Sequence, residues 1–134
     1  MTATACPAFV MVVDDDTDLR ETLIEVLQDK AYRTVGASNG QEALDLLHTA
    51  PGLLPCVILL DLMMPVMDGR QFRAALLLEP ELSEIPIIVL SAHADVDELF
   101  PGLSVAARLR KPVDLAPLLS LVDRHCKEPP AALG

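Results

Sequence analysis

The sequence predicts a single α/β domain built on a parallel sheet, and two observations point to that fold class. Three short apolar runs, at residues 9–13, 56–60 and 87–90, have the length and composition of strands buried on both faces. Segments with the apolar spacing of helices separate these runs, and such alternation is typical of a parallel sheet. The chain has 134 residues, of which 51% are hydrophobic, so it can bury one core.

The first half of the chain begins with the expected strand at residues 9–13. Apolar side chains then recur at helical spacing over residues 19–27, and residues 33–37 are expected to form a second strand. Asn39 followed three residues later by Glu42 is a helix-capping pattern, so a second helix is expected to begin there.

The third strand, at residues 56–60, is followed by a second capping pattern. Asp68 with Gln71 predicts the start of a helix that runs to about Glu79. Residues 80–86 have a proline at each end and are expected to form a loop before the next apolar run.

The last third of the chain has weaker signals. Residues 96–100 are expected to form a short helix that Pro101 ends, and residues 105–109 a weak fifth strand. A last helix is expected at residues 115–125. The chain is therefore divided into an N-terminal extension at residues 1–8, one domain at residues 9–126, and a tail at residues 127–134 that is expected to be disordered.

Acidic and hydroxyl side chains gather where the apolar runs end. Four carboxylates follow the first run, and one acid and one hydroxyl follow the next two, at Asp14, Asp15, Asp16, Asp18, Asp61 and Ser91. In a parallel sheet these positions meet along one edge, where ligands bind. Two carboxylates about 4 Å apart repel by roughly 4 kcal/mol at an effective dielectric near 20. A bound cation relieves that repulsion, and hard oxygen ligands suit Mg²⁺. Asp16 and Asp18 also suit a helix N-terminus, where the dipole favours acids.

Composition excludes several classes of function. The net charge of −10 and the pI of about 4.5 argue against direct binding to nucleic acid or to anionic membrane surfaces. No apolar stretch has the length of a membrane span, and the N-terminus lacks the pattern of a signal peptide. The three cysteines, Cys6, Cys56 and Cys126, are odd in number and have no metal-ligand spacing, so reduced thiols in the cytoplasm are expected.

Four motifs, in order and in register, resemble the receiver domain of bacterial two-component response regulators. They are Val12-Val13-Asp14-Asp15, Leu59-Leu60-Asp61-Leu62-Met63-Met64-Pro65-x-x-Asp68-Gly69, Val89-Leu90-Ser91-Ala92 and Lys111-Pro112. The resemblance covers about residues 9–125. It implies a flavodoxin-like, doubly wound sheet of five parallel strands in the order 2-1-3-4-5, with helices on both faces.

The resemblance also implies roles for the matching residues. Asp61 corresponds to the phosphoacceptor, a carboxylate that forms an acyl phosphate by nucleophilic attack. The Mg²⁺ ligands implied are Asp14, through water, Asp15, Asp61 and the backbone carbonyl of Met63. Lys111 is expected to contact a phosphoryl oxygen as a point charge, and its bond to Pro112 is expected to be cis.

Three further positions follow from the same resemblance. Ser91 corresponds to the hydroxyl that binds the phosphoryl group and draws its loop inward. Met63 is expected to shield the site from water, while His93 either orients water or is simply solvated. Receivers usually carry an aromatic residue three positions before the lysine, whereas this chain has Arg108 there.

Arg108 and the shortened fourth helix, near residues 96–100, put the usual output route in doubt. An unpaired guanidinium is costly to bury, so Arg108 is expected to stay solvated or to pair with an acid such as Asp95, Asp97 or Glu98. We therefore expect a monomer.

The expected function is a phosphorylatable receiver that accepts a phosphoryl group from a histidine kinase or a histidine phosphotransfer protein and switches conformation to control a partner protein. No enzymatic activity is expected beyond its own phosphorylation and dephosphorylation. Three alternatives remain: a receiver-fold binding module that is not phosphorylated, a domain cut from a hybrid histidine kinase, and an aspartate-nucleophile phosphatase. The last normally needs an acid two residues after the nucleophile, where this chain has Met63.

Overall fold

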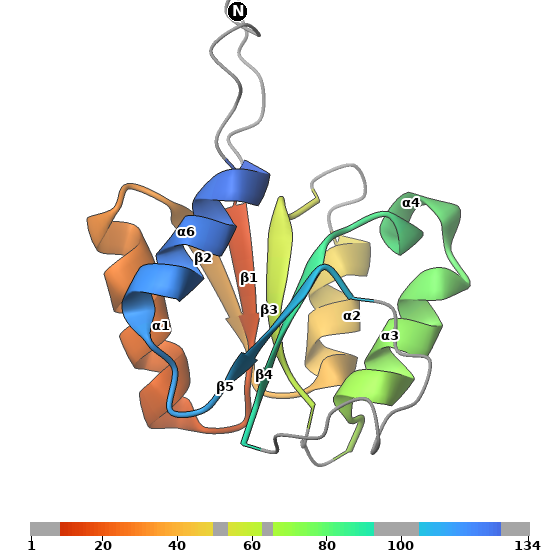
Figure 1. Cartoon of the computed structure of the whole chain (residues 1–134). Coiled ribbons are helices and arrows are strands. Elements are labelled where there is room, and N and C mark those ends of the chain that lie inside the picture. Colours follow the sequence, from red (N-terminus) through yellow and green to blue (C-terminus); the bar gives the residue numbers. More distant parts are fainter. Residues whose placement is uncertain (1–8, 50–53, 63–65, 93–104, 127–134) are drawn as a thin grey trace, which may run out of the picture.

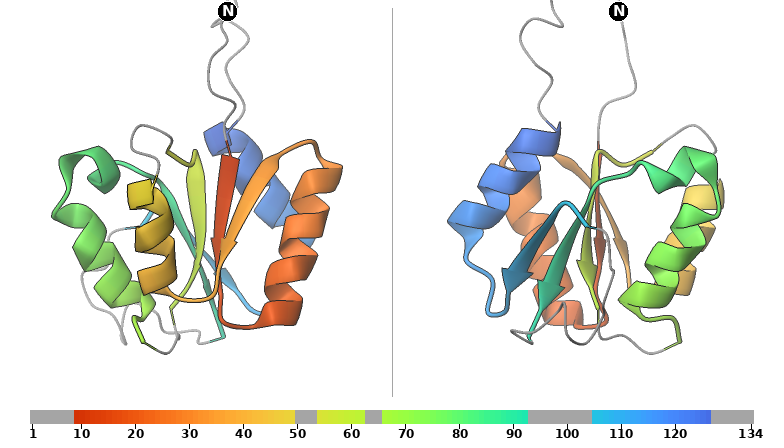
Figure 2. Two further views of the ribbon diagram at one scale, coloured as in Figure 1. Left: turned by 180° about the vertical axis from the view of Figure 1, so that it is seen from behind. Right: turned by 45° about the vertical axis from the view of Figure 1, so that its right-hand side comes forward.

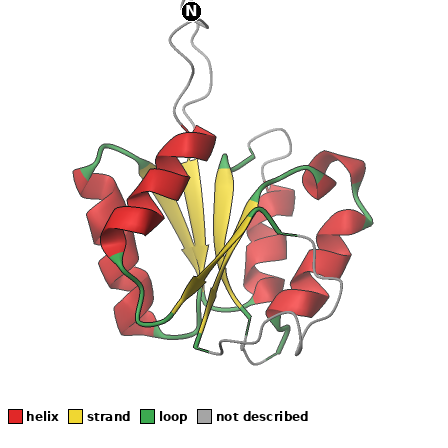
Figure 3. Cartoon of the chain, viewed as in Figure 1, coloured by secondary structure: helices red, strands yellow, loops and turns green. Residues whose placement is uncertain are grey.

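The computed structural model describes residues 9–49, 54–62, 66–92 and 105–126, and these form a three-layer α/β domain (Figure 1). Five parallel strands lie in the order β2-β1-β3-β4-β5. Helices cover both faces of the sheet (Figure 3). The predicted fold class and strand order are confirmed.

The strands are short, and the central ones are buried on both faces. Their bounds are β1 Phe9–Val13, β2 Arg33–Ala37, β3 Val57–Asp61, β4 Ile87–Ser91 and β5 Ala107–Arg110. Every residue of β3 and β4 is buried, as their continuous apolar runs predict. Asp61 and Ser91 are the last residues of their strands rather than the first residues after them. The fifth strand begins two residues later than expected and alternates between half-buried and exposed positions.

The helices form two layers, one on each face of the sheet (Figure 2). α1 (Thr17–Asp29) and α6 (Leu115–Cys126) pack on one face, where Leu23 and Leu118 belong to one apolar cluster. α2 (Gly40–Thr49), α3 (Gly69–Leu77) and α4 (Pro80–Ser83) pack on the other.

The predicted capping residues begin their helices. The Asp16 side chain accepts from the Leu19 amide at the start of α1. The carboxylate of Asp68 accepts from the Gln71 amide, and the Gln71 side chain accepts in return from the Asp68 amide. Such a box satisfies donors that the helix itself leaves free, so it fixes where α3 begins. α3 begins at Gly69, next to Leu62 and to the carbonyl oxygen of Asp61. The N-terminus of α3 therefore lies at the edge of the sheet that carries Asp61.

Two expectations are wrong. Residues 80–86 are not simply a loop, because α4 occupies Pro80–Ser83 with the proline at its first position, where no amide donor is needed. Cys56 and Cys126 are not free thiols but form a disulfide. The expectations for residues 1–8, 96–100 and 127–134 lie outside the described residues. Among the described residues, no helix is long and apolar enough to span a membrane.

Candidate phosphoryl and metal site

The acids that the sequence places at strand ends are neighbours in space. β1 and β3 pair in parallel with Val13 opposite Leu60, so Asp14 and Asp61 follow on adjacent strands at the carboxyl edge of the sheet. One carboxylate oxygen from each of Asp14, Asp15 and Asp61 lies within 4.8 Å of the others. Asp14 is fully buried and Asp61 is 4% exposed, while Asp15 is exposed. The cluster therefore joins two buried carboxylates to one that faces solvent.

Asp14 is held from three directions. Its Oδ1 accepts from the Asp16 amide at 2.9 Å, its Oδ2 accepts from Lys111 Nζ at 3.0 Å, and its backbone carbonyl accepts from Arg20 at 2.6 Å. These contacts fix the buried carboxylate before any ligand arrives. Asp16 caps α1 and Asp18 lies in its first turn, so these two acids belong to the helix N-terminus.

Lys111 enters the site from the end of β5. Its amide donates to the Ser91 carbonyl at 2.8 Å, and the bond to Pro112 is cis, as expected. Its Nζ lies 3.0 Å from Asp14 and 3.5 Å from Asp61. Burial by itself lowers the pKa of Lys111, but the hydrogen bond that Lys111 donates to Asp14 and the charges of Asp61 and Asp14 outweigh it, so the pKa is raised. The lysine is therefore a fixed cation between two acids.

Leu62, the residue after β3, lies against the N-terminus of α3. The Gly69 amide donates to the Leu62 carbonyl at 3.0 Å. A Cβ on Gly69 would lie 2.5 Å from Leu62 Cδ2, 2.8 Å from Leu62 Cα and 3.2 Å from the Asp61 carbonyl oxygen. Only glycine allows this approach, so Gly69 helps to fix the backbone next to Asp61.

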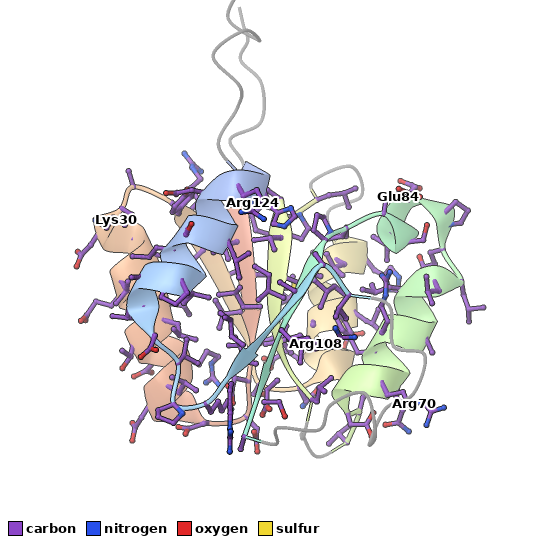
Figure 4. All side chains as sticks on the ribbon, viewed as in Figure 1. Lys30, Arg70, Glu84, Arg108 and Arg124 are labelled. Atoms are coloured by element: carbon purple, nitrogen blue, oxygen red, sulfur yellow. A yellow bond between two sulfur atoms is a disulfide. The ribbon has the colours of Figure 1, made fainter. Side chains whose placement is uncertain are left out.

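The remaining predicted positions divide into described and undescribed residues. Ser91 is 2% exposed and ends β4 next to β3. Arg108, labelled in Figure 4, is exposed on β5. Met63 and His93 lie outside the described residues, as do the acids suggested as partners for Arg108.

Sequence reasoning missed two contributors to the site, Arg20 and Gly69. Arg20 lies one helical turn after the cap at Asp16, which directs it back toward the end of β1. That spacing was visible in the sequence, but its target, a backbone carbonyl, has no sequence signal. Gly69 was read only as part of a motif, because its crowding against Leu62 is a property of the folded loop.

The donor set fits a hard divalent cation. Three carboxylates and one ammonium leave the cluster with an excess of negative charge, and carboxylate oxygens with retained waters are what Mg²⁺ prefers. The exposed Asp15 leaves one side of the cluster open to water and to an incoming ligand. The arrangement can therefore hold an oxygen-rich ligand such as a phosphoryl group beside a cation and a carboxylate nucleophile.

Comparisons with known proteins agree with this geometry. Residues 10–123 match the family model described as response regulator receiver domain. Response regulator MprA of Mycolicibacterium vanbaalenii is 38% identical over 120 residues, which cover 85% of this chain and 48% of MprA. The chain thus spans about half the length of that relative, and 36% of the length of a probable transcriptional regulator of Guillardia theta that it also matches.

Solved structures show the same fold. A response regulator receiver protein from Pseudomonas putida is 34% identical, with a TM-score of 0.80 over 90% of this chain and 99% of that chain. The response regulator TrrA of Thermotoga maritima, solved in complex with Mg²⁺-BeF, is 25% identical, with a TM-score of 0.75 over 87% of this chain and 97% of that one.

Proposed function

This chain belongs to the response regulator receiver domain family, and on that premise we propose that it accepts a phosphoryl group on Asp61 and changes conformation in response. The observation that carries the proposal is the cluster of Asp14, Asp15 and Asp61 with Lys111 Nζ 3.0 Å from Asp14 and 3.5 Å from Asp61. Repulsive acids around a half-buried lysine have no evident use in a scaffold that binds no ligand.

In the proposed reaction, a carboxylate oxygen of Asp61 attacks the phosphorus of a phosphohistidine. The phosphorus–nitrogen bond breaks, the imidazole leaves, and an acyl phosphate forms on Asp61. The phosphohistidine belongs to a histidine kinase or a histidine phosphotransfer protein. Lys111 moves from its pairing with the acids to a phosphoryl oxygen, which neutralises part of the added charge.

Asp14, Asp15 and Asp61 would hold Mg²⁺, together with the backbone carbonyl of Met63 that the family resemblance implies. When bound, the ion supplies positive charge that offsets the negative charge of the phosphoryl oxygens. The Mg²⁺-BeF complex of TrrA supports this part of the proposal, since that protein shares the fold.

Ser91 is proposed to couple phosphorylation to conformation. Its carbonyl accepts from the Lys111 amide at 2.8 Å, so β4 and the lysine are joined at the point where the phosphoryl group would arrive. If the Ser91 hydroxyl turns toward the phosphoryl oxygen, the end of β4 and the hydrogen-bonded Lys111 backbone would move with it. The change then shifts an equilibrium between two existing conformations, which a partner protein reads.

The test is incubation with acetyl phosphate and Mg²⁺ followed by intact mass. Wild type is expected to gain one phosphoryl group that hydroxylamine removes, and EDTA is expected to prevent the gain. Asp61→Asn is expected to gain none. Asp18→Asn, which removes an exposed acid of the first turn of α1, is the matched control and is expected to behave as wild type.

Three results would contradict the proposal. No adduct on the folded wild type would favour a binding module. An adduct of equal yield on Asp61→Asn would place the phosphoryl group elsewhere. Continuous release of phosphate with turnover would favour a phosphatase.

A further inference from the structure

The end of α6 is covalently joined to the start of β3. Cys126 is the last residue of α6, and Cys56 directly precedes β3. Their Cα atoms are 5.2 Å apart, within the usual range for a disulfide, and their sulfurs are bonded across a sequence separation of 70. We propose that Cys56 and Cys126 form a reversible thiol–disulfide modification site, opened and closed by small-molecule thiols and disulfides, that controls how firmly α6 is held on the sheet.

Apolar side chains, a hydrogen bond and the disulfide attach the C-terminal part of α6 to the sheet. Leu118, Val122 and Cys126, spaced by four residues, are its buried side chains. Asp123 adds one polar contact, since it accepts a hydrogen bond from the Tyr32 hydroxyl. Beyond Val122, the disulfide, this hydrogen bond and the packing of Cys126 in its apolar cluster all help to hold the last turn.

The two sulfurs differ in access, which sets the direction of exchange. Cys56 is half-buried, whereas Cys126 is 7% exposed inside the cluster that contains Leu118 and Val122. An incoming thiolate therefore attacks the sulfur of Cys56, and Cys126 leaves as the thiolate and takes up a proton. A second thiol molecule then displaces Cys56 from the mixed disulfide.

The exchange balances without any other reactant. Two molecules of a thiol such as glutathione and the protein disulfide give two protein thiols and one molecule of the oxidised small-molecule disulfide. Oxidised glutathione drives the same steps in reverse, with two electrons transferred in each direction.

The fold accommodates the reduced form as well as the oxidised one. The sulfur of Cys56 lies 3.2 Å from the Phe9 carbonyl oxygen, which offers the free thiol a hydrogen-bond acceptor. A reduced Cys126 can stay in its apolar cluster, because a free cysteine behaves as a small hydrophobic side chain. The disulfide is thus a removable link rather than a requirement of the fold.

This site is separate from the acid cluster. Cys56 precedes β3 and Asp61 ends it, and a five-residue strand places its ends roughly 17 Å apart. In Figure 1 the C-terminal end of α6 lies near the start of β1 and β3, opposite the strand ends that carry the acids. The inference does not rest on phosphorylation of Asp61, so its test and that of the phosphoryl site can fail independently.

The first experiment measures the exchange itself. The full chain carrying Cys6→Ser, which leaves only the proposed pair, is equilibrated at a series of ratios of reduced to oxidised glutathione, then alkylated and weighed. The expected result is a direct conversion between a species with no alkyl groups and one with two. Two accessible thiols at every ratio, a disulfide closed at every ratio, or a glutathione adduct that stays on Cys56 would each overturn the proposal.

The second experiment measures the effect on α6 in the same Cys6→Ser protein, so the two redox states that are compared have the same sequence. The oxidised form is expected to melt roughly 10 °C higher than the reduced form, because the link closes a long loop. Amide hydrogen exchange at residues 123–126 is expected to be about tenfold faster after reduction.

A matched control and an internal probe complete the test. Cys56→Ser and Cys126→Ser are expected to melt at a temperature that does not depend on the glutathione ratio. Tyr32 is the single tyrosine in a chain without tryptophan, so its fluorescence reports the contact with Asp123. Equal melting temperatures and equal exchange in the two redox states would overturn control of α6 by this link.

Discussion

Lys111 Nζ lies 3.0 Å from Oδ2 of Asp14, a carboxylate that is fully buried. A buried carboxylate is costly without a partner, and the lysine is the positive group that the chain itself supplies. The pair joins the end of β1 to the end of β5, the second and fifth strands of the sheet order. Without a ligand, the lysine therefore does part of what a metal ion would do.

Replacing Lys111 by Met should separate two effects. Mg²⁺ is expected to bind several-fold more tightly, because a competing cation has been removed from Asp14 and Asp61. The rate of phosphorylation by acetyl phosphate is expected to fall roughly 100-fold, since a preorganised positive group is lost. Calorimetric titration and intact mass measure the two quantities. The control is Lys30→Met, which changes an exposed lysine that Figure 4 labels. Weaker Mg²⁺ binding by Lys111→Met would contradict the role of Lys111 as a cation that competes with the metal.

Mg²⁺ is expected to raise the melting temperature, and Asp15→Asn to reduce that gain. A ligand at a hundredfold excess over its dissociation constant stabilises the native state by about 2.7 kcal/mol. Asp15 is exposed, so removing its charge should raise metal-free stability slightly by relieving repulsion in the cluster. Asp14 is a poorer choice, because its carboxylate also accepts from Lys111 and from the Asp16 amide. Melts in EDTA and in millimolar Mg²⁺ that do not differ would mean that the acids hold no ion.

Gly69→Ala is expected to lower the free energy of unfolding by about 1–3 kcal/mol and to slow phosphorylation. The added Cβ would meet the Leu62 backbone at 2.8 Å, and backbone cannot move aside without shifting the segment after Asp61. Gly36→Ala is the matched control, because the nearest atoms that its Cβ would meet belong to the flexible side chains of Ile24 and Arg20 rather than to backbone. Urea unfolding compares the two, and an equal or smaller loss at Gly69 would show that the crowding is relieved locally.

The Tyr32 hydroxyl should titrate at unusually high pH. Burial, then the hydrogen bond to Asp123 and its charge, raise the pKa of Tyr32 from 10.0 to about 12. The folded state therefore holds this proton more tightly than the unfolded state. The stability that results is complete below about pH 10 and is lost as the pH rises through about 12.

Tyrosinate absorbance measures this pKa directly in the oxidised protein. Asp123→Asn keeps a hydrogen-bonding side chain but removes the negative charge, so its Tyr32 pKa is expected to fall toward 10. An unchanged titration curve in that variant would mean that Asp123 does not raise the pKa of Tyr32.

The parts of the fold that were predicted correctly are those with strong local signals. β1, β3 and β4 contain continuous apolar runs, and the spacing of Asp68 and Gln71 predicts the cap of α3. The predicted start of β5 is two residues too early, because the residues of a half-exposed edge strand are no more apolar than the residues on either side of it. α4 was missed because four residues after a proline are too short for helical periodicity to show.

The candidate site was predictable as a set of residues but not as a geometry. Motif spacing brings Asp14, Asp61 and Lys111 to one edge, whereas the pairing of the lysine with Asp14 depends on side-chain reach. The disulfide could not be predicted from the sequence, for a different reason. Cys56 and Cys126 meet only because α6 crosses the sheet toward the start of β3, which no local pattern encodes.

The strand order also divides the site between two parts of the chain. Asp14 and Asp15 follow β1, while Asp61, Ser91 and Lys111 all come after α2, yet β1 and β3 are neighbours in the sheet. A chain cut between α2 and β3 would leave two of the acids on one fragment and the proposed nucleophile and lysine on the other. Neither fragment alone contains the complete cluster, so recovery of tight Mg²⁺ binding on mixing the two would report that the central strands had paired in register.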